Sequence, residues 1–135
     1  MFRVIIADDE NRIVKMLAAS IPWTKLGLSI ASFASDGMEA LRLAEEKKAD
    51  IIITDIRMPG LNGLELCEKL HEANPNIQII LISGYADFSY AQRAIQLGVL
   101  GYCLKPVDIQ YLQKLLRQAV QNIRREVSLQ ADTLL

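Results

Sequence analysis

The chain has few residues of the kinds that bind soft metals or cross a membrane. Among its 135 residues there is one histidine, His71, and two cysteines, Cys67 and Cys103, without CxxC spacing. This pattern argues against a zinc site and favours two buried or partly buried thiols. No apolar run approaches the ~18 residues of a membrane span, and the acidic residues from Asp8 onward interrupt any signal-peptide core. These absences predict a cytoplasmic protein with no membrane partner.

An excess of charge of one sign is also missing. The 15 basic and 16 acidic residues leave a formal net charge of -1. Nucleic acids attract proteins through an excess of positive charge, so we expect no direct nucleic-acid binding by this stretch. With 51% hydrophobic and 23% charged residues, the composition is that of one globular domain, whose folding buries roughly two thirds of the surface of the unfolded chain.

The sequence does contain four short apolar runs that each end in a reactive polar residue. They are residues 4–7 before Asp8 and Asp9, 51–54 before Asp55, 77–82 before Ser83, and 100–104 before Lys105. Short runs rich in Ile and Val, without alternation, are typical of parallel strands buried on both faces. Ligands of such sheets lie beyond the carboxyl ends of the strands, so these polar side chains should meet at one edge.

Segments with helical periodicity separate the runs, which predicts a doubly wound α/β sheet of five parallel strands with five helices. A fifth strand is expected at residues 28–34. Helices are expected at residues 11–20, after Asp36, after Asn62, from residue 87 to before Gly98, and from about Asp108. Asp36 and Asn62 are each followed three residues later by a glutamate, as in a capping box. In the helix after Asp36, the residues expected to face the sheet are Met38, Leu41 and Ala44.

The last helix is longer than the sheet requires. Its apolar residues keep a three-and-four spacing as far as Val127, although about 14 helical residues, or ~21 Å, already match the length of a strand. The part beyond Val120 is either a coiled-coil connector to a further domain or partner, or a frayed terminus. We therefore divide the chain into a domain at residues 1–125 and a helical extension or linker at residues 126–135.

In the flavodoxin-like strand order 2-1-3-4-5, the first and third strands are neighbours, which places Asp8 and Asp9 opposite Asp55. Unit charges about 4 Å apart repel by roughly 4 kcal/mol at an effective dielectric near 20, so this cluster should shift its pKa values or bind a cation. Oxygen ligands suit Mg²⁺. Asp55 is the best-placed nucleophile toward phosphorus, with Lys105 and Ser83 binding phosphoryl oxygens. A structural acidic patch at helix N-termini is the alternative.

Four motifs follow the strands in a fixed order. They are Asp8-Asp9, residues 55–60 (DIRMPG) with Gly63, Ser83-Gly84, and Lys105-Pro106. Over residues 1 to about 125 the chain resembles the receiver domain of bacterial two-component response regulators. The resemblance implies a signalling switch, not an enzyme, in which Asp55 accepts a phosphoryl group from a sensor histidine kinase. It implies Mg²⁺ bound by Asp9, Asp55 and the backbone carbonyl of Arg57, with Asp8 acting partly through water.

The resemblance also implies how phosphorylation would change the surface of the domain. Ser83 and Tyr102 look like the family's switch pair, whose movement reshapes the face formed by the fourth helix, fifth strand and fifth helix, through which a homodimer could form. A cis bond before Pro106 would aim Lys105 inward. Gly84 would free the loop after Ser83, and Gly63 has a structural role. Arg57 and Tyr85 stand where the family tunes phosphate lifetime, and we hypothesise that their bulk restricts attacking water.

A narrower resemblance comes from residues 21–27 (IPWTKLG) and 84–91 (GYADFSYA). Both are similar to the YesN-type subgroup, whose members usually carry a C-terminal AraC-type helix-turn-helix domain. We therefore expect a receiver separated from a longer transcription regulator, with a DNA-binding output domain downstream. One departure is Gly101, where many relatives place an acidic residue.

Two other functions use similar residues. A haloacid-dehalogenase-like phosphatase also has an aspartate nucleophile and Mg²⁺, but it needs a second Asp two residues later, where this chain has Arg57. A pseudo-receiver, serving only as an interaction module, would lack part of the site, yet every expected residue type is present. A dinucleotide-binding domain would need GxGxxG after the first strand, and a serine hydrolase would need a histidine nearer to Ser83 than His71.

Overall fold

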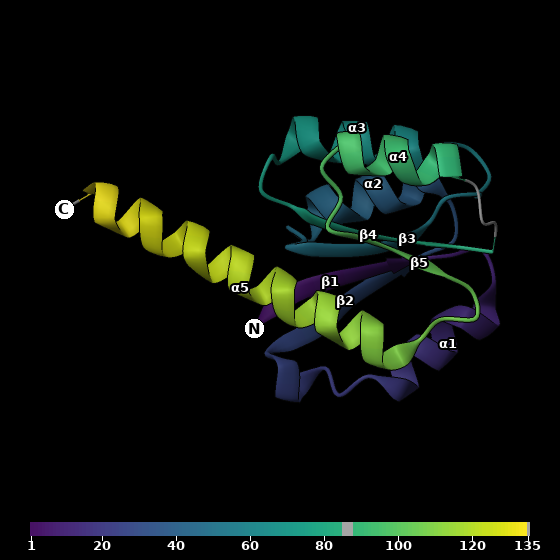
Figure 1. Ribbon diagram of the computed structural model, residues 1–135, viewed down its shortest axis with the longest axis horizontal. Helices are drawn as coiled ribbons and strands as arrows, with labels where there is room; N and C mark the ends of the chain where they lie inside the picture. The colour runs from purple at the N-terminus through teal and green to yellow at the C-terminus, as the bar shows by residue number, and fades with distance from the viewer. Residues whose placement is uncertain (85–87, 135) are drawn as a thin grey trace.

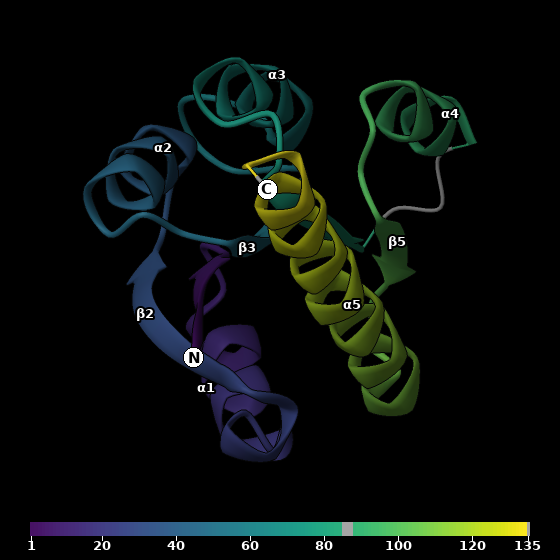
Figure 2. The same cartoon turned by 90° about the vertical axis from the view of Figure 1, so that its left-hand side faces the viewer.

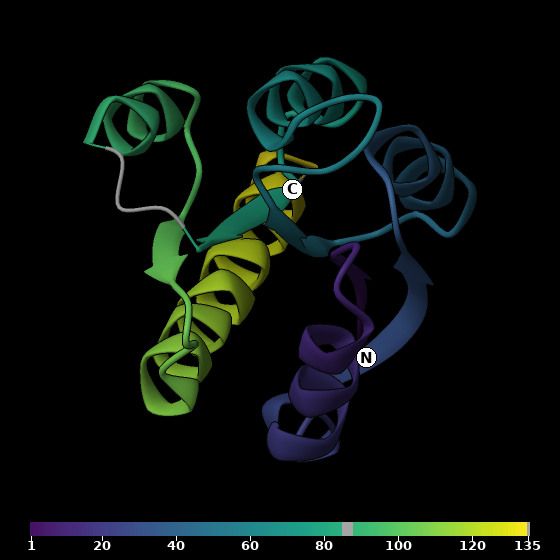
Figure 3. The same ribbon diagram turned by 90° about the vertical axis from the view of Figure 1, so that its right-hand side faces the viewer.

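The computed structural model describes residues 1–84 and 88–134, with the backbone alone at residues 88 and 131–134. Its five parallel strands are β1 (Phe2–Ala7), β2 (Leu28–Ala34), β3 (Ile51–Asp55), β4 (Gln78–Ser83) and β5 (Gly101–Leu104). They form one sheet in the order β2-β1-β3-β4-β5, which confirms the predicted topology. Figure 3 shows β2 and β5 at its two edges.

The helices form a layer on each face of this sheet. They are α1 (Asn11–Ser20), α2 (Gly37–Glu46), α3 (Gly63–Ala73), α4 (Phe88–Gln96) and α5 (Ile109–Leu134), with a 3-10 turn η1 (Thr24–Leu26). Helices α2, α3 and α4 cover one face, and α1 and α5 cover the other (Figures 1 and 2). Among the described residues, no helix combines the length and apolar character of a membrane span.

Both faces of the sheet are buried, which explains why its central strands read as continuous apolar runs. Successive residues of β3 point to opposite faces, so Ile52 joins the cluster beneath α2, α3 and α4, while Ile53 joins the one beneath α1 and α5. Both cysteines lie in these clusters. Burial raises the pKa of Cys67 to about 12 and that of Cys103 to about 11, so neither thiol is reactive near neutrality.

Helix starts follow the sequence signals closely. The Asn62 side chain accepts from the backbone N–H of Glu65 at 3.0 Å, and the Glu65 carboxylate accepts from the N–H of Asn62 at 3.4 Å, which completes the capping box. Asp36 accepts from the N–H of Glu39 at 2.8 Å and so caps α2. The Glu39 carboxylate accepts from the Ser35 hydroxyl at 3.5 Å instead of from the backbone N–H of Asp36, so the capping box predicted at the start of α2 is only half formed.

The inward face of α2 differs from the prediction. Met38 is 59% exposed, whereas Ala44 is buried and Leu41 partly buried as expected. The residues that α2 buries are Gly37, Ala40, Leu43 and Ala44. Gly37 lies so close to Leu61 that a Cβ there would collide with the Leu61 backbone, so Gly37 occupies an inward position of α2 and its neighbour Met38 faces outward.

Helix α5 extends past the sheet, as its length predicted (Figure 1). Leu112 and Leu116 are fully buried, but Val127 is 57% exposed. The helix crosses residue 125 without a break, so the division of the chain at that point stays a prediction.

At the start of β5, a Cβ on Gly101 would lie 2.5 Å from Leu115 Cδ1, so Leu115 fills the space that a side chain would need.

Candidate functional site

The carboxyl ends of β1, β3 and β5 bring a buried ion cluster together. The Lys105 ammonium lies 3.0 Å from Asp8 Oδ2, 3.0 Å from Asp55 Oδ2 and 3.1 Å from Glu10 Oε1. The side chains of Asp8, Asp55 and Lys105 are 0%, 7% and 11% exposed, whereas that of Glu10 is 57% exposed. The sequence predicted that Asp8, Asp9, Asp55 and Lys105 meet at one edge of the sheet, and the structure brings all four together there.

Three carboxylates in this cluster are arranged to hold a cation. Asp8, Asp9 and Asp55 each offer an oxygen, and these oxygens all lie within 4.8 Å of one another. Asp8 Oδ1 accepts from the backbone N–H of Glu10 at 2.8 Å. Asp8 Oδ2 is buried. Among the described residues it forms an ion pair with Lys105 but no hydrogen bond. An oxygen-only donor set with a buried, under-bonded carboxylate fits Mg²⁺.

The charges of the cluster do not balance. Burial raises the pKa of Asp8, and the nearby charge of Asp55 adds to that rise, although the backbone hydrogen bond from Glu10 and the ion pair with Lys105 oppose it. Burial would lower the pKa of Lys105, but its hydrogen bonds to Asp55 and Glu10 and its ion pair with Asp8 outweigh that effect and raise the pKa. Lys105 therefore remains a cation, and one ammonium faces four carboxylates when Asp9 is included. A further cation would relieve this imbalance.

Ser83 and Tyr102 lie on the two strands at the β5 edge. Ser83 is buried at the end of β4, and its carbonyl accepts from the backbone N–H of Lys105 at 2.7 Å. Tyr102 is partly buried and packs against the cluster beneath α2, α3 and α4. In the sheet, Ser83 pairs with Leu104, the residue before Lys105, and Tyr102 pairs with Leu81.

Two backbone features shape the site. Gly63 begins α3 against the end of β3, where a Cβ would lie 2.7 Å from Ile56 Cα and 2.8 Å from the Asp55 carbonyl oxygen. Only a residue without a side chain permits this approach. The Lys105-Pro106 peptide bond is cis. Gly84 is exposed, with open space around the position of a Cβ.

The loop after β3 connects the site with α4. Asp55 Oδ1 accepts from the backbone N–H of Arg57 at 3.3 Å. The Arg57 guanidinium lies 5.7 Å from the centroid of the Tyr90 ring on α4, a cation–π contact. Tyr85, the other residue expected to tune phosphate lifetime, lies outside the described residues.

Sequence reasoning assigned no role to Glu10 or Tyr90. Glu10 directly follows Asp8 and Asp9 at the end of an apolar run, so its position was a usable signal for a third partner of Lys105. Tyr90 carried no comparable signal, because its contact with Arg57 joins two elements that are distant in the sequence.

Comparisons with known proteins agree with the resemblance to receiver domains. A family profile described as "Response regulator receiver domain" matches residues 4–117. The transcriptional regulatory protein YesN of Bacillus subtilis strain 168 is 37% identical over 126 residues, which are 93% of this chain and 34% of that protein. The chain thus spans about a third of the length of this curated relative.

Solved structures agree with this match. The REC domain of AraT, a response regulator from Geobacillus stearothermophilus, is 39% identical with a TM-score of 0.87, covering 93% of this chain and 97% of that one. A chain of the CheX-CheY-BeF3-Mg²⁺ complex from Borrelia burgdorferi is 26% identical with a TM-score of 0.79, covering 88% of this chain and 89% of that one.

Proposed function

The chain belongs to the response regulator receiver domain family, and from this premise we propose that Asp55 accepts a phosphoryl group from a phosphohistidine of a sensor histidine kinase. One Asp55 carboxylate oxygen forms the new bond to phosphorus, while the bond from phosphorus to the histidine nitrogen breaks and the imidazole keeps its electron pair. The observation that carries this proposal is the buried Lys105 ammonium, 3.0 Å from Asp55 beside two further aspartates.

Mg²⁺ is the proposed cofactor. Asp9, Asp55 and the backbone carbonyl of Arg57 would hold it directly, and Asp8 partly through water. When bound, Mg²⁺ would neutralise charge on the phosphoryl oxygens. Support comes from the all-oxygen donor set and from the buried Asp8 oxygen without a hydrogen bond. The Borrelia complex, a structure of the same fold, contains Mg²⁺ together with the phosphoryl mimic BeF3.

Lys105 and Ser83 would bind the transferred group. The Lys105 ammonium already lies against Asp55, so it needs only to turn from the carboxylate to a phosphoryl oxygen. The Ser83 hydroxyl would donate to another. Tyr102 would then turn inward, and this shift between two packings would change the surface of α4, β5 and α5. The phosphate needs to favour one packing by only a few kcal/mol.

The same face is the proposed site of output and of a homodimer. Three large apolar side chains are exposed on its three elements: Ile95 on α4 (72%), Leu104 on β5 (48%) and Tyr111 on α5 (42%). Exposed apolar side chains on each of these three elements favour contact with a partner. In the cell, residues 1–125 would act as a cytoplasmic receiver and residues 126–135 as a link to a DNA-binding domain that controls transcription.

The test uses acetyl phosphate with Mg²⁺ and intact-protein mass spectrometry. The wild type should gain the mass of one phosphoryl group, and Asp55→Asn should gain none. Asp50→Asn is the matched control, because Asp50 lies at the other end of the same strand. Equal phosphoryl mass on Asp55→Asn and on the wild type would refute the site. Steady turnover of a small phosphate ester would support the phosphatase interpretation instead.

Dimer formation has its own measurement. Light scattering with and without beryllofluoride and Mg²⁺ should show a larger mass in the activated state. A monomer mass in both states would refute activation by dimerisation while leaving phosphorylation of Asp55 untouched.

A further inference from the structure

A second charged feature lies at the other end of the sheet, between η1 and the middle of α5. It is a groove of about 360 Å³ with three cations in its lining, Lys25, Arg117 and Arg124, and no acidic residue. The groove adjoins the amino ends of β1 and β2, because the Gly27 carbonyl accepts from the N–H of Phe2 at 3.0 Å. It is therefore separate from the ion cluster around Asp55.

The three cations have no acidic partner in the part of the chain that the structure describes. All three side chains are exposed, and none forms an ion pair with another described residue. Arg42 provides a contrast, since its guanidinium pairs with Glu46 at 2.8 Å. Like charges gathered around one groove repel each other, and an anionic ligand would relieve that repulsion.

The walls of the groove are already in place. The Trp23 indole donates to the Ala18 carbonyl at 3.2 Å, and the Trp23 carbonyl accepts from the N–H of Leu28 at 2.9 Å. Gly27 ends η1 with a positive φ of 78°, a conformation that favours glycine. A Cβ at Gly27 would lie 3.7 Å from Arg124 Nη2, so that guanidinium lies over the turn. A ligand would therefore have little backbone to order on binding.

The groove also offers apolar surface. Val120 is 5% exposed and Leu26 is partly buried, and both line it. A long polyanion such as DNA is disfavoured, because the chain has a net charge of -1 and the groove has only three cations. Arginine forks bind carboxylates in pairs of hydrogen bonds, and the apolar floor suits an aliphatic side chain.

We propose that the groove between η1 and α5 binds an acidic, amphipathic peptide segment of a partner protein. The carboxylates of the segment pair with Arg117, Arg124 and Lys25, and one apolar side chain packs on Val120 and Leu26. This docking does not require phosphorylation of Asp55.

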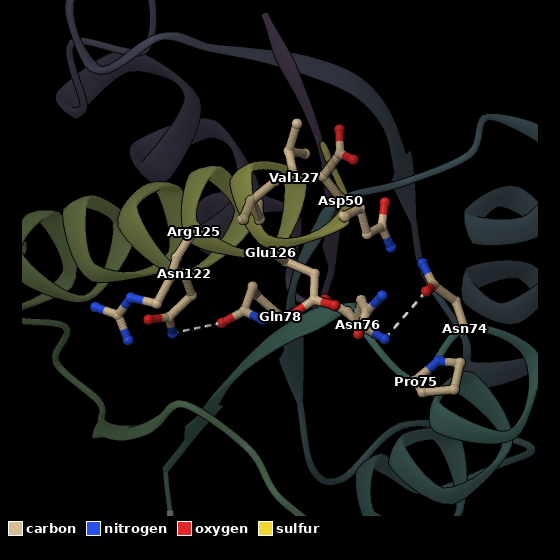
Figure 4. A pocket seen from close by; sticks show the side chains of 11 residues that line it. Asp50, Asn74, Pro75, Asn76, Gln78, Asn122, Arg125, Glu126 and Val127 are labelled. Carbon is tan, nitrogen blue, oxygen red and sulfur yellow. Dashed lines mark hydrogen bonds between the residues drawn. The ribbon is translucent and has the colours of Figure 1, made fainter. Parts of the chain in front are cut away.

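The neighbouring Arg125 provides a matched control. It lies one residue further along α5 and lines a different groove of about 430 Å³ (Figure 4). That groove also contains the carboxylates of Asp50 and Glu126 and several carboxamides, so it has charges of both signs. A general effect of removing one positive charge from α5 would therefore appear equally in Arg125→Gln.

The experiment measures fluorescence anisotropy of a labelled short peptide of Glu, Leu and Ala, beside the same peptide with Gln in place of Glu. The acidic peptide should bind, and added salt should weaken it. The double variant Arg117→Gln with Arg124→Gln should bind about tenfold more weakly, while Arg125→Gln and Asp55→Asn match the wild type. Emission of Trp23, the single tryptophan, gives a second readout next to the groove.

Four results of the binding measurements would overturn the proposal. These are no binding of the acidic peptide, equal binding of the Gln peptide, equal affinity of the double variant and Arg125→Gln, and tighter binding of a short DNA duplex than of the peptide. Self-association lost in the double variant would assign the groove to a second copy of the chain and would also overturn it. Circular dichroism of each variant establishes that the fold is intact.

Discussion

Two regions at opposite ends of the sheet, the ion cluster and the amide contacts between α5 and β4, treat their polar side chains in opposite ways. At the carboxyl end, Asp8 and Asp55 share one ammonium in a buried ion cluster. Between α5 and β4 at the amino end, neutral amide groups satisfy one another: Asn122 Nδ2 donates to Gln78 Oε1 at 2.9 Å, and Gln78 Nε2 donates to the backbone carbonyl of Asn76 at 3.2 Å. Figure 4 shows this carboxamide contact beside α5. The amide contacts need nothing from outside, whereas the ion cluster has an unbalanced charge, and that imbalance allows it to respond to a ligand.

The largest expected effect comes from removing the one cation of the ion cluster. Lys105→Met leaves Asp8 and Asp55 buried without a counter-ion, so the free energy of unfolding in chelator should fall by about 3 kcal/mol. Mg²⁺ should restore part of it. Urea unfolding with and without MgCl₂ measures both effects, with Lys114→Met, on an exposed lysine of α5, as the control. A loss equal to that of the control would show that the cluster is not coupled to stability.

Asp8→Asn should act in the opposite direction. In the wild type, burial raises the pKa of Asp8 above its ordinary value of 3.8, so folding favours the protonated form. Stability in chelator should then fall as pH rises from about 3.8 through the folded-state pKa, and the variant should lack this fall. At neutral pH the variant should be more stable, on the order of 1 kcal/mol, and gain less from Mg²⁺.

Asp50→Asn sharpens this comparison at the amino end. Asp50 Oδ2 accepts from the backbone N–H of Arg3 at 2.8 Å, and the groove that it lines holds several carboxamides and charges of both signs. Its replacement should bring no gain in stability and leave the response to Mg²⁺ unchanged. Equal behaviour of Asp8→Asn and Asp50→Asn in urea titrations would mean that the two ends of the sheet do not differ as argued.

Features that local sequence determines could be predicted, whereas features that depend on contacts between distant residues could not. The strands and the meeting of Asp8, Asp55 and Lys105 were predictable, because local apolar runs and the rule for parallel sheets determine them. The outward turn of Met38 was not, since it depends on how closely Gly37 approaches Leu61.

Contacts between distant side chains were equally inaccessible. The bond from Lys105 to Glu10 joins residues 95 positions apart; the position of Glu10 after Asp8 and Asp9 indicates the right edge of the sheet, but not that its side chain reaches the ammonium. The contact of Arg57 with Tyr90 likewise depends on the position of α4 relative to the β3 end of the sheet.

At the amino end, Asn122→Ala should have a moderate effect. It removes the donor to Gln78 and leaves that carboxamide with one bond fewer, at a cost of about 1 kcal/mol in unfolding free energy. Mg²⁺ should stabilise the variant and the wild type equally. Gln121→Ala, on the exposed neighbouring residue, is the control in thermal and urea unfolding. A changed response to Mg²⁺ would mean that the two ends are coupled through β4.

The smallest expected effect concerns the loop beside Asp55 and rests on the proposed phosphorylation. If the bulk of Arg57 and Tyr85 restricts attacking water, alanine at both positions should shorten the half-life of the acyl phosphate, measured by loss of phosphoryl mass over time.

The cation–π contact with Tyr90 contributes only about 0.5–1 kcal/mol, so Tyr90→Leu should shift the decay by a few-fold at most. Arg93→Ala, on an exposed arginine of α4, should decay like the wild type. An unchanged half-life in the double alanine variant would remove the shielding role, whereas faster decay in Tyr90→Leu would show that Arg57 shields the site because α4 holds it in place.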